Sequence, residues 1–392
     1  NTNINTGIGS DMVNVENISG ETNVKLGEDD DILSASNINQ ELNDISAQLT
    51  VSGDSGFDML DVNDSGDTQN NTAIIDSTSI TGLGMNGEID YGNFEDMSVQ
   101  FGSGSDKITI KGSNPLGSYI TTGEGDDVVN VEKIDSETTI KLQGGNDIVN
   151  VSNNNQKVDE IASILIMSGG IGRDTLNVDD SGDSEDNTAT VYDTLITGLG
   201  MNGEIDYGNF EQLNIGMGSG NDILSIESTH QKTTSVNTNA GKDTVNVENI
   251  SGETKVQLGV DDDTANIGDI NQQMDNINAM LSILADAGND VLNIDDSGDI
   301  QNNTATVNTN QITGLGMSSK IDYSNIETLK MWLGLGKDVI SIDSLSADTE
   351  IHTGLTEDLV ITENLSLLAA QLIVDNQRKN QKGEEEALGQ EI

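Results

Sequence analysis

The sequence predicts an all-β fold, a right-handed parallel β-helix or β-roll-like solenoid with about five coils per repeat, and three observations predict it. The 392-residue chain repeats itself every 116 residues. Each long repeat contains Gly-x-Gly-x-Asp motifs about 20 residues apart, and apolar residues alternate with polar ones after each motif. Because a unit of about 20 residues cannot bury its apolar face alone, successive units are expected to stack as parallel coils.

The long repeat is visible in two segments that return without insertion or deletion. The segment Asp-Ser-Gly-Asp begins at Asp64, Asp180 and Asp296, and the segment Ile-Thr-Gly-Leu-Gly-Met begins at Ile80, Ile196 and Ile312. We therefore expect three repeats, at residues 1–126, 127–242 and 243–358, followed by a C-terminal part at 359–392.

The short repeat is marked by the last residue of each motif. In the first long repeat the markers are Asp11, Asp31, Asp58, Asn86, Asp106 and Asp127, with spacings of 20, 27, 28, 20 and 21 residues. These spacings predict five coils per long repeat. Asn86 and its equivalents Asn202 and Ser318 are weaker ligands than Asp, so we expect that corner to be poor in metal.

Each coil is predicted to contain at least two short strands. Val13 and Val15 follow the first marker with a polar residue between them, which places one face of a strand inside. A second strand follows a polar turn, with Val24 and Leu26 inward. Ile140 with Leu142, and Val256 with Leu258, repeat this second pair.

Two of the spacings are longer, and the first excess predicts one short helix in each long repeat. Ile38, Leu42, Ile45 and Leu49 follow one another at helical spacing. Their copies are Val158, Ile161 and Leu165, and Ile270, Met274, Ile277 and Leu281. The other excess is a polar loop from Asp64 to Thr72, rich in turn-forming residues.

At the C-terminus, Leu365 to Val374 predicts a helical cap, and a polar tail follows from Asn376. A β-sandwich of antiparallel hairpins is the alternative fold, although few Asn-Gly or Asp-Gly turns join adjacent strands.

Charge restricts the partners. The chain has 68 acidic and 16 basic residues, a net charge of −52, and no cysteine. Nucleic acid is disfavoured because binding it requires Lys and Arg to replace counterions on phosphates, and an anionic membrane is disfavoured for the same reason. No apolar run is long enough for membrane insertion. Without thiolates, any metal has to be bound by oxygen.

Stacked coils place the marker carboxylates about 5 Å apart, where each neighbouring pair repels by about 3 to 4 kcal/mol at an effective dielectric of about 20. Ca²⁺ suits this position because it accepts about six to eight oxygen ligands in flexible geometry, and glycines allow tight turns that direct carbonyls at an ion. The alternative is an Asp and Asn ladder that caps backbone amides without any ion. The candidate calcium ligands are Gly7, Gly9, Asp11, Gly27, Asp29, Asp31, Gly56, Asp58, Gly102, Gly104, Asp106, Gly123, Gly125, Asp127, Gly145, Asp147, Gly172, Asp174, Gly218, Gly220, Asp222, Gly241, Asp243, Gly259, Asp261, Asp263, Gly288, Asp290, Gly334, Gly336 and Asp338.

The motifs resemble haemolysin-type (RTX) calcium-binding repeats over residues 1 to 360, and the long-repeat segments resemble those of giant bacterial surface proteins. The resemblance implies that glycine carbonyls and the Asp carboxylate of one coil share a Ca²⁺ with the next coil. This chain departs from the family in having one such corner per roughly 20 residues, and the opposite corner at Glu16 to Glu21 lacks the glycines. We therefore expect one main column of ions. Asp179, Asp180, Asp183 and Asn187 form either a second kind of calcium site or a solvated turn.

These features predict a structural or adhesive segment of a secreted or cell-surface protein, without catalytic residues, that Ca²⁺ folds and stiffens. Its expected partners are calcium, other copies of itself in a fibre or filament, and extracellular glycans. The alternative is a β-helical polysaccharide-active enzyme, resembling lyases or epimerases. Its active site would need residues that break the repeat, and His230, His352 and Arg173 are the candidates, whereas Tyr91, Tyr207 and Tyr323 recur identically and indicate core or turn positions.

Overall fold

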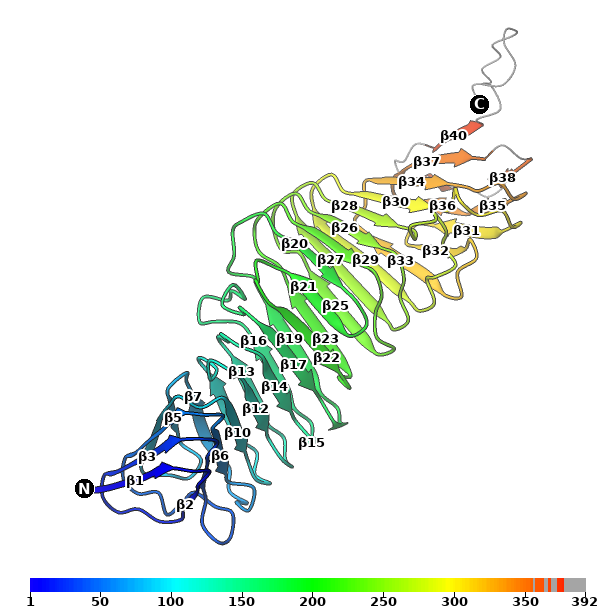
Figure 1. Cartoon of the computed structure of the whole chain (residues 1–392). Coiled ribbons are helices and arrows are strands. Elements are labelled where there is room, and N and C mark those ends of the chain that lie inside the picture. The colour runs from blue at the N-terminus through cyan, green and yellow to red at the C-terminus, as the bar shows by residue number, and fades with distance from the viewer. Residues whose placement is uncertain (355–356, 363–365, 368–371, 377–392) are drawn as a thin grey trace. The chain divides into compact units, whose positions relative to one another are not determined.

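The computed structural model describes residues 1–354, 357–362, 366–367 and 372–376. All regular elements among these residues are β-strands, and most neighbouring strands are parallel (Figure 1). The chain divides into two compact units, one of Asn1–Ile223 with Thr229–Asn239, the other of Leu224–Ser228 with the chain from Ala240 onward. The prediction of an all-β parallel solenoid is confirmed in this coarse form.

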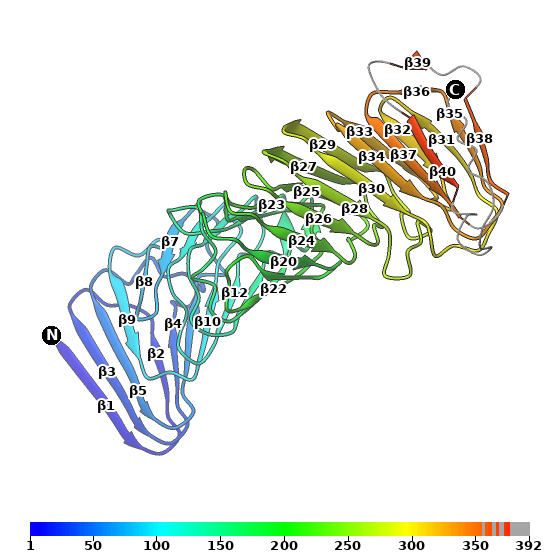
Figure 2. The same cartoon turned by 90° about the horizontal axis from the view of Figure 1, so that it is seen from above.

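In unit 1 the chain passes alternately between two sheets, here called A and B. Figure 2 shows β1, β3, β5 and β9 of sheet A side by side. Sheet A contains β1 (Thr2–Ile8), β3 (Thr22–Glu28), β5 (Leu49–Ser55), β7 (Thr72–Ile75), β8 (Ser79–Thr81), β9 (Glu88–Gly92), β11 (Lys107–Ile110), β13 (Val128–Val131), β16 (Ile148–Val151), β19 (Thr175–Asp179), β23 (Gln212–Gly216) and β25 (Thr233–Asn237). Sheet B contains β2 (Met12–Val15), β4 (Ile32–Ala35), β6 (Met59–Asn63), β10 (Asp96–Gln100), β12 (Ser118–Thr121), β14 (Thr138–Lys141), β17 (Ile164–Ser168), β20 (Thr188–Val191), β21 (Leu195–Gly198) and β22 (Glu204–Gly208). β15 (Gly144–Gly145) pairs with β18 (Ile171–Gly172).

Unit 2 has the same construction, with sheets here called C and D. Sheet C contains β27 (Thr254–Val260), β29 (Leu281–Ala287), β31 (Thr304–Asn308), β32 (Gln311–Gly314), β33 (Lys320–Ser324), β35 (Val339–Ile342) and β38 (Leu359–Ile361). Sheet D contains β24 (Ile223–Ile226), β26 (Thr244–Val247), β28 (Thr264–Ile267), β30 (Val291–Asp295), β34 (Thr328–Trp332), β37 (Asp348–Thr353) and β40 (Leu372–Asn376). β36 (Ser344–Leu345) pairs with β39 (Ser366–Leu367).

The core consists of aliphatic rows that run from strand to strand. Leu33 of β4 lies opposite Leu60 of β6, which lies opposite Met97 of β10, and all three are fully buried. Alternate side chains of each strand face outward, since the period of a strand is two. The inward pairs predicted from the sequence are confirmed, because Val24, Leu26, Ile140, Leu142, Val256 and Leu258 are all buried.

The prediction of a short helix in each long repeat is wrong, because no helix occurs among the described residues. The segment between β4 and β5 is a loop in which Leu42 and Ile45 are buried, while Ile38 is 90% exposed. Ile45 forms a parallel bridge with Ile18 of the preceding coil, and Asn37 Oδ1 accepts the N–H groups of Asn39 and Glu41. The loop therefore buries its apolar residues against the neighbouring coil, which satisfies the helical spacing without a helix. The bridges of Ile134 with Ile161 and of Ile250 with Ile277 repeat this contact.

Each long repeat also contains an antiparallel excursion. β8 is antiparallel to both β7 and β9, and β9 then returns to parallel pairing with β5. β20–β21–β22 and β31–β32–β33 are its copies. Asn86 lies between β8 and β9, so the prediction that it marks a fifth coil like the others is wrong.

The predicted C-terminal helix falls mostly outside the described residues. Where residues of 359–392 are described they form strands, and β40 pairs in parallel with β37. The helical cap predicted at Leu365 to Val374 is therefore wrong at residues 366–367 and 372–374, which form strands, and the polar tail beyond Asn376 lies outside the described residues. Among the described residues there is no helix with the length and apolar character needed to cross a membrane.

Candidate metal-binding ladders of buried aspartates

The motif Asp residues lie at turns between two sheets, where the backbone N–H of one Asp donates to the carboxylate of the Asp in the next coil. The N–H of Asp11 donates to Asp31 Oδ1 over 2.7 Å, and the N–H of Asp106 donates to Asp127 Oδ1 over 2.7 Å. The same bond joins Asp31 to Asp58, Asp127 to Asp147, Asp147 to Asp174, Asp243 to Asp263, Asp263 to Asp290, and Asp338 to Asp358. We call these series the Asp ladders.

The ladders have ends that the motif did not reveal. The N–H of Asp58 donates to Glu95 Oε2 over 2.8 Å, and Glu211 and Glu327 end their ladders in the same way. At the other end, the N–H of Asn71 donates to Asp106 Oδ1, as those of Asn187 and Asn303 do to Asp222 and Asp338. These Asn and Glu residues lack flanking Gly-x-Gly, and only their recurrence at 116 residues marked them in the sequence.

The ladder also changes side within a unit. Asp11, Asp31 and Asp58 precede strands of sheet B, whereas Asp106, Asp127, Asp147 and Asp174 precede strands of sheet A. In unit 2, Asp263 and Asp290 precede strands of sheet D, and Asp338 precedes a strand of sheet C. The exchange occurs at the antiparallel excursion, whose three strands β7, β8 and β9 all lie in sheet A. The prediction of one continuous column therefore does not hold for the marker carboxylates. They form separate ladders that change at each excursion: one runs from Asp11 to Glu95, the next from Asn71 to Glu211, and the ladder of Asp338 begins at Asn303.

The second carboxylate oxygen of the ladder residues has no protein partner. Oδ2 is buried and accepts no hydrogen bond from any described residue in Asp11, Asp31, Asp58, Asp106, Asp127, Asp147, Asp174, Asp263 and Asp290. Buried polar atoms are nearly always paired, and leaving a buried carboxylate oxygen unpaired is costly. A regular series of such atoms matches the oxygen ligands that a hard divalent cation requires.

Burial also disturbs the protonation of the ladder. Burial is the main reason that the pKa of Asp127 and Asp263 is raised to about 7 and that of Asp147 to about 6, and the neighbouring carboxylates act in the same direction. The backbone N–H on Oδ1 acts in the opposite direction but does not outweigh burial. Without a cation the ladder thus holds its negative charge at a considerable free-energy cost. A protonated carboxyl group and a bound cation are the two ways of removing that cost.

No protein-family model matches the chain, and no curated protein matches it. The interpretation of the ladders therefore depends on their geometry. Among the predicted ligands, Asp29 and Asp261 are not part of the ladders, since both are exposed and cap the N–H groups of Gly9 and Gly241. Asn86, Asn202 and Ser318 lie in the excursion turns, away from the Oδ1 bonds that define the ladders.

The motif glycines allow successive turns to approach closely. Gly27 has φ +113°, and a Cβ atom there would lie 1.9 Å from the carbonyl oxygen of Gly7. Gly123 has φ +94°, and its Cβ would lie 1.8 Å from the carbonyl oxygen of Gly102. Only glycine tolerates both the backbone conformation and this contact. The glycines therefore have a packing role, whether or not their carbonyls also bind an ion.

In each Asp-Ser-Gly-Asp loop both aspartates are buried, whereas the Ser and Gly between them are not. Asp180 is fully buried and Asp183 is 4% exposed. Asn187 Nδ2 donates to Oδ2 of both, and Asp180 Oδ1 accepts the N–H of Val158. Burial raises the pKa of Asp180 to about 7, as it does for Asp64 and Asp296 in the other repeats.

The loop of the second repeat brings three carboxylates together. Asp159, Asp180 and Asp183 each offer an oxygen within 4.8 Å of the others. The ammonium group of Lys157 lies 2.5 Å from Asp183 Oδ1, so a cation of the chain itself occupies this loop. The equivalent residue is Glu41 in the first repeat and Gln273 in the third.

The tyrosine and histidine candidates for catalysis make contacts within the fold. Tyr207 is buried, and its hydroxyl donates to the carbonyl of Tyr192 over 2.6 Å. Tyr91 and Tyr323 make the same contact with Asp76 and Asn308. His230 lies edge-on to Tyr207, and His352 stacks on Trp332 with ring centroids 5.3 Å apart.

Proposed function

We propose that this chain is a calcium-binding structural and adhesive segment of a secreted or cell-surface protein, similar to RTX repeat proteins. The observation that supports it best is the series of buried Oδ2 atoms without a hydrogen-bond partner. An ion-free ladder needs only the Oδ1 bonds, and asparagine would provide those without charge. The use of aspartate at the buried positions favours a bound cation.

The ladder residues offer oxygen ligands of the type that calcium prefers. Carboxylate oxygens of neighbouring ladder residues, such as Asp127 and Asp147, would hold the ion together with backbone carbonyls of the glycine turns. A bound divalent ion supplies positive charge between carboxylates that otherwise repel one another. The chain contributes the turns that position these oxygens and the burial that excludes water from them.

Metal binding of this kind couples to folding. The ladder exists only when coils stack, so an ion that binds the ladder binds only the folded chain and stabilises it. In the calcium-rich medium outside a cell, loaded ladders would hold the coils together and give a stiff segment. Within a calcium-poor cell the same chain would be held back from folding by its own charge.

Native mass spectrometry of the full chain, after dialysis against Ca²⁺, tests this proposal. We expect several bound ions per chain, removal by EDTA, and a melting temperature that falls strongly in EDTA. Mg²⁺ at the same concentration serves as the control, because it prefers octahedral sites and keeps its waters. A count of zero together with an unchanged melting temperature in EDTA would exclude calcium from the ladders.

A further inference from the structure

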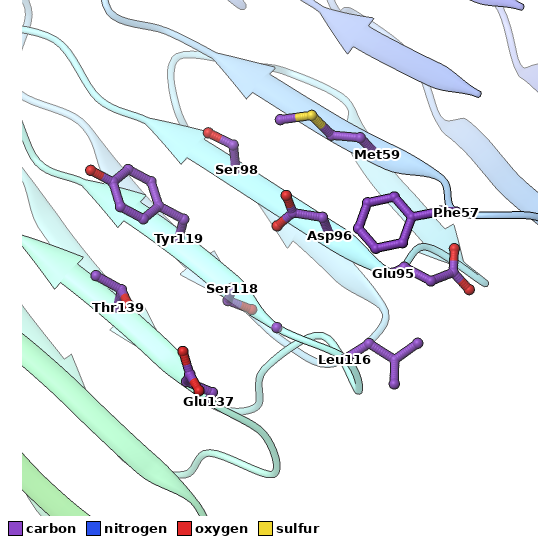
Figure 3. A pocket seen from close by; sticks show the side chains of 11 residues that line it. Phe57, Met59, Glu95, Asp96, Ser98, Leu116, Ser118, Tyr119, Glu137 and Thr139 are labelled. Carbon is purple, nitrogen blue, oxygen red and sulfur yellow. The ribbon is translucent and has the colours of Figure 1, made fainter. Parts of the chain in front are cut away.

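The outer face of sheet B carries a hollow in the first long repeat. Its volume is about 490 Å³, and it is lined by residues of β6, β10, β12 and β14 and of the turn before β12 (Figure 3). The volume falls within the range of small-ligand sites.

Three large, mainly apolar side chains are exposed at this hollow. Phe57 is 59% exposed, Leu116 65% and Tyr119 36%. Each departs from the long repeat, because the equivalent residues are Arg173 and Asn289 for Phe57, Lys232 for Leu116, and Ser235 for Tyr119. Elsewhere the repeat keeps polar residues at these outward positions, so an apolar group gathered around one hollow indicates a binding surface.

Leu116 is presented by a firmly held turn. Asn114 is 1% exposed, and its Nδ2 donates to the carbonyls of Phe94 over 3.0 Å and Gly117 over 3.1 Å. The backbone N–H of Asn114 donates to Ser118 Oγ. Because the buried Asn114 holds this turn by hydrogen bonds, the fold itself keeps Leu116 at the surface.

The polar groups of the hollow include both donors and acceptors. Ser98, Tyr119 and Thr139 lie side by side on β10, β12 and β14, and their hydroxyl groups make no hydrogen bond to any described residue. Asp96 and Glu137 add carboxylates that form no ion pair within the described chain. Figure 3 shows the ring of Phe57 beside Asp96 and Glu95, with Tyr119 and Thr139 on the neighbouring strands.

We propose that this hollow binds an uncharged polysaccharide. Sugar rings have apolar C–H faces, which suit Phe57, Leu116 and the face of the Tyr119 ring that the Lys141 ammonium group, 5.3 Å from the ring centroid, leaves uncovered. Sugar hydroxyl groups both donate and accept, which suits Ser98, Thr139 and the carboxylates. Acidic glycans are disfavoured by Glu95, Asp96 and Glu137 and by the net charge of −52. A basic peptide would use only the acceptors, and the three hydroxyl donors favour the sugar. The inference rests on the adhesive part of the proposed function and not on the ions of the ladders.

The second long repeat provides an internal comparison. A hollow of about 460 Å³ on this repeat has no aromatic lining residue, and it shares two equivalent positions with the Phe57 hollow, Asn214 for Ser98 and Ser235 for Tyr119. Its floor is a row of amides already bonded to one another, from Asn214 to Asn177 and from Asn177 to Asn150. This surface lacks the exposed Phe, Leu and Tyr side chains of the Phe57 hollow.

Isothermal titration of the full chain in Ca²⁺ buffer tests the proposal, with uncharged hexasaccharides of glucose, mannose and galactose as probes. We expect at least one of them to bind, and Phe57→Asn and Tyr119→Ser, which restore residues of the other repeats, to weaken it at least tenfold. Leu116→Lys provides a third variant of the same kind. Tyr192→Ser is the matched control, since Tyr192 is 38% exposed at another place in unit 1, and it should leave binding unchanged.

Three results would overturn the proposal: no binding of any hexasaccharide, unchanged binding by all three variants, or binding of penta-arginine that is lost in the same variants. Melting temperatures of the variants should equal that of the parent chain, which shows that the fold is intact. The ion count, measured on the same samples, separates the two proposals. Ions without glycan binding remove only the glycan site, and glycan binding without ions removes only the calcium ladders.

Discussion

Replacing Asp127 with asparagine distinguishes a cation-loaded ladder from an ion-free one. Asp127 is fully buried, its Oδ1 accepts the N–H of Asp106, and its Oδ2 has no hydrogen-bond partner. Asparagine keeps the Oδ1 acceptor and the shape but removes the charge. The substitution therefore has opposite effects on stability in the two states.

The magnitudes follow from the pKa and from ligand linkage. A pKa of about 7 in place of 3.8 corresponds to about 4 kcal/mol at most for holding the carboxylate ionised at pH 8. The new amide N–H group lacks a partner, which costs about 1 to 3 kcal/mol. In EDTA we thus expect Asp127→Asn to stabilise the fold by about 1 to 3 kcal/mol. In calcium at about 1,000 times its Kd, loss of one ion costs about 4.1 kcal/mol, which exceeds this gain, so the variant should be less stable than the parent.

Thermal unfolding at pH 8, followed by circular dichroism with and without calcium, measures both effects. For a unit of this size a change of 1 kcal/mol moves the melting temperature by about 2 to 4 °C. Asp126→Asn, at the exposed neighbouring position, is the control and should change little in either buffer. If Asp127→Asn shifts the melting temperature in the same direction with calcium and with EDTA, the ladder does not hold calcium at this position.

Three further predictions concern the turns, the protons and the loops. Gly123→Ala should destabilise the chain by about 2 kcal/mol or more, because the new Cβ meets the carbonyl of Gly102 at φ +94°, whereas Gly208→Ala meets nothing and should be neutral in the same melts. In EDTA the melting temperature should fall as pH rises from 5 to 8: the folded carboxyls of Asp127 and Asp263, with pKa about 7, hold protons that the unfolded chain, with its ordinary pKa near 3.8, has released. A flat profile in EDTA would contradict the raised pKa values. Lys157→Gln removes the ammonium group beside Asp183, so it should lower the melting temperature in EDTA and add one calcium ion to the count by native mass spectrometry. An unchanged count would mean that these loops do not take up ions.

Much of the fold follows from local pattern. The inward rows, such as Val24 with Leu26, were predictable because alternation along a strand depends only on neighbouring residues. The helix predicted at Ile38 to Leu49 is absent. The same spacing of apolar residues also suits a loop that buries Leu42 and Ile45 against the neighbouring coil. Periodicity alone does not identify the surface against which a segment packs.

The sequence by itself determined the 116-residue repeat, the parallel strands and the Asp that closes each motif, since these are regularities of order and spacing. The tertiary structure decided which atoms meet: the exchange of the ladder between the two sides, the Asn71 and Glu95 ends, and the buried Oδ2 atoms. The physical reason is that a ladder bond joins residues 20 to 37 positions apart, as from Asp11 to Asp31 and from Asp58 to Glu95. Its partner therefore depends on which coil lies on which, and a single antiparallel excursion of the chain changes that arrangement.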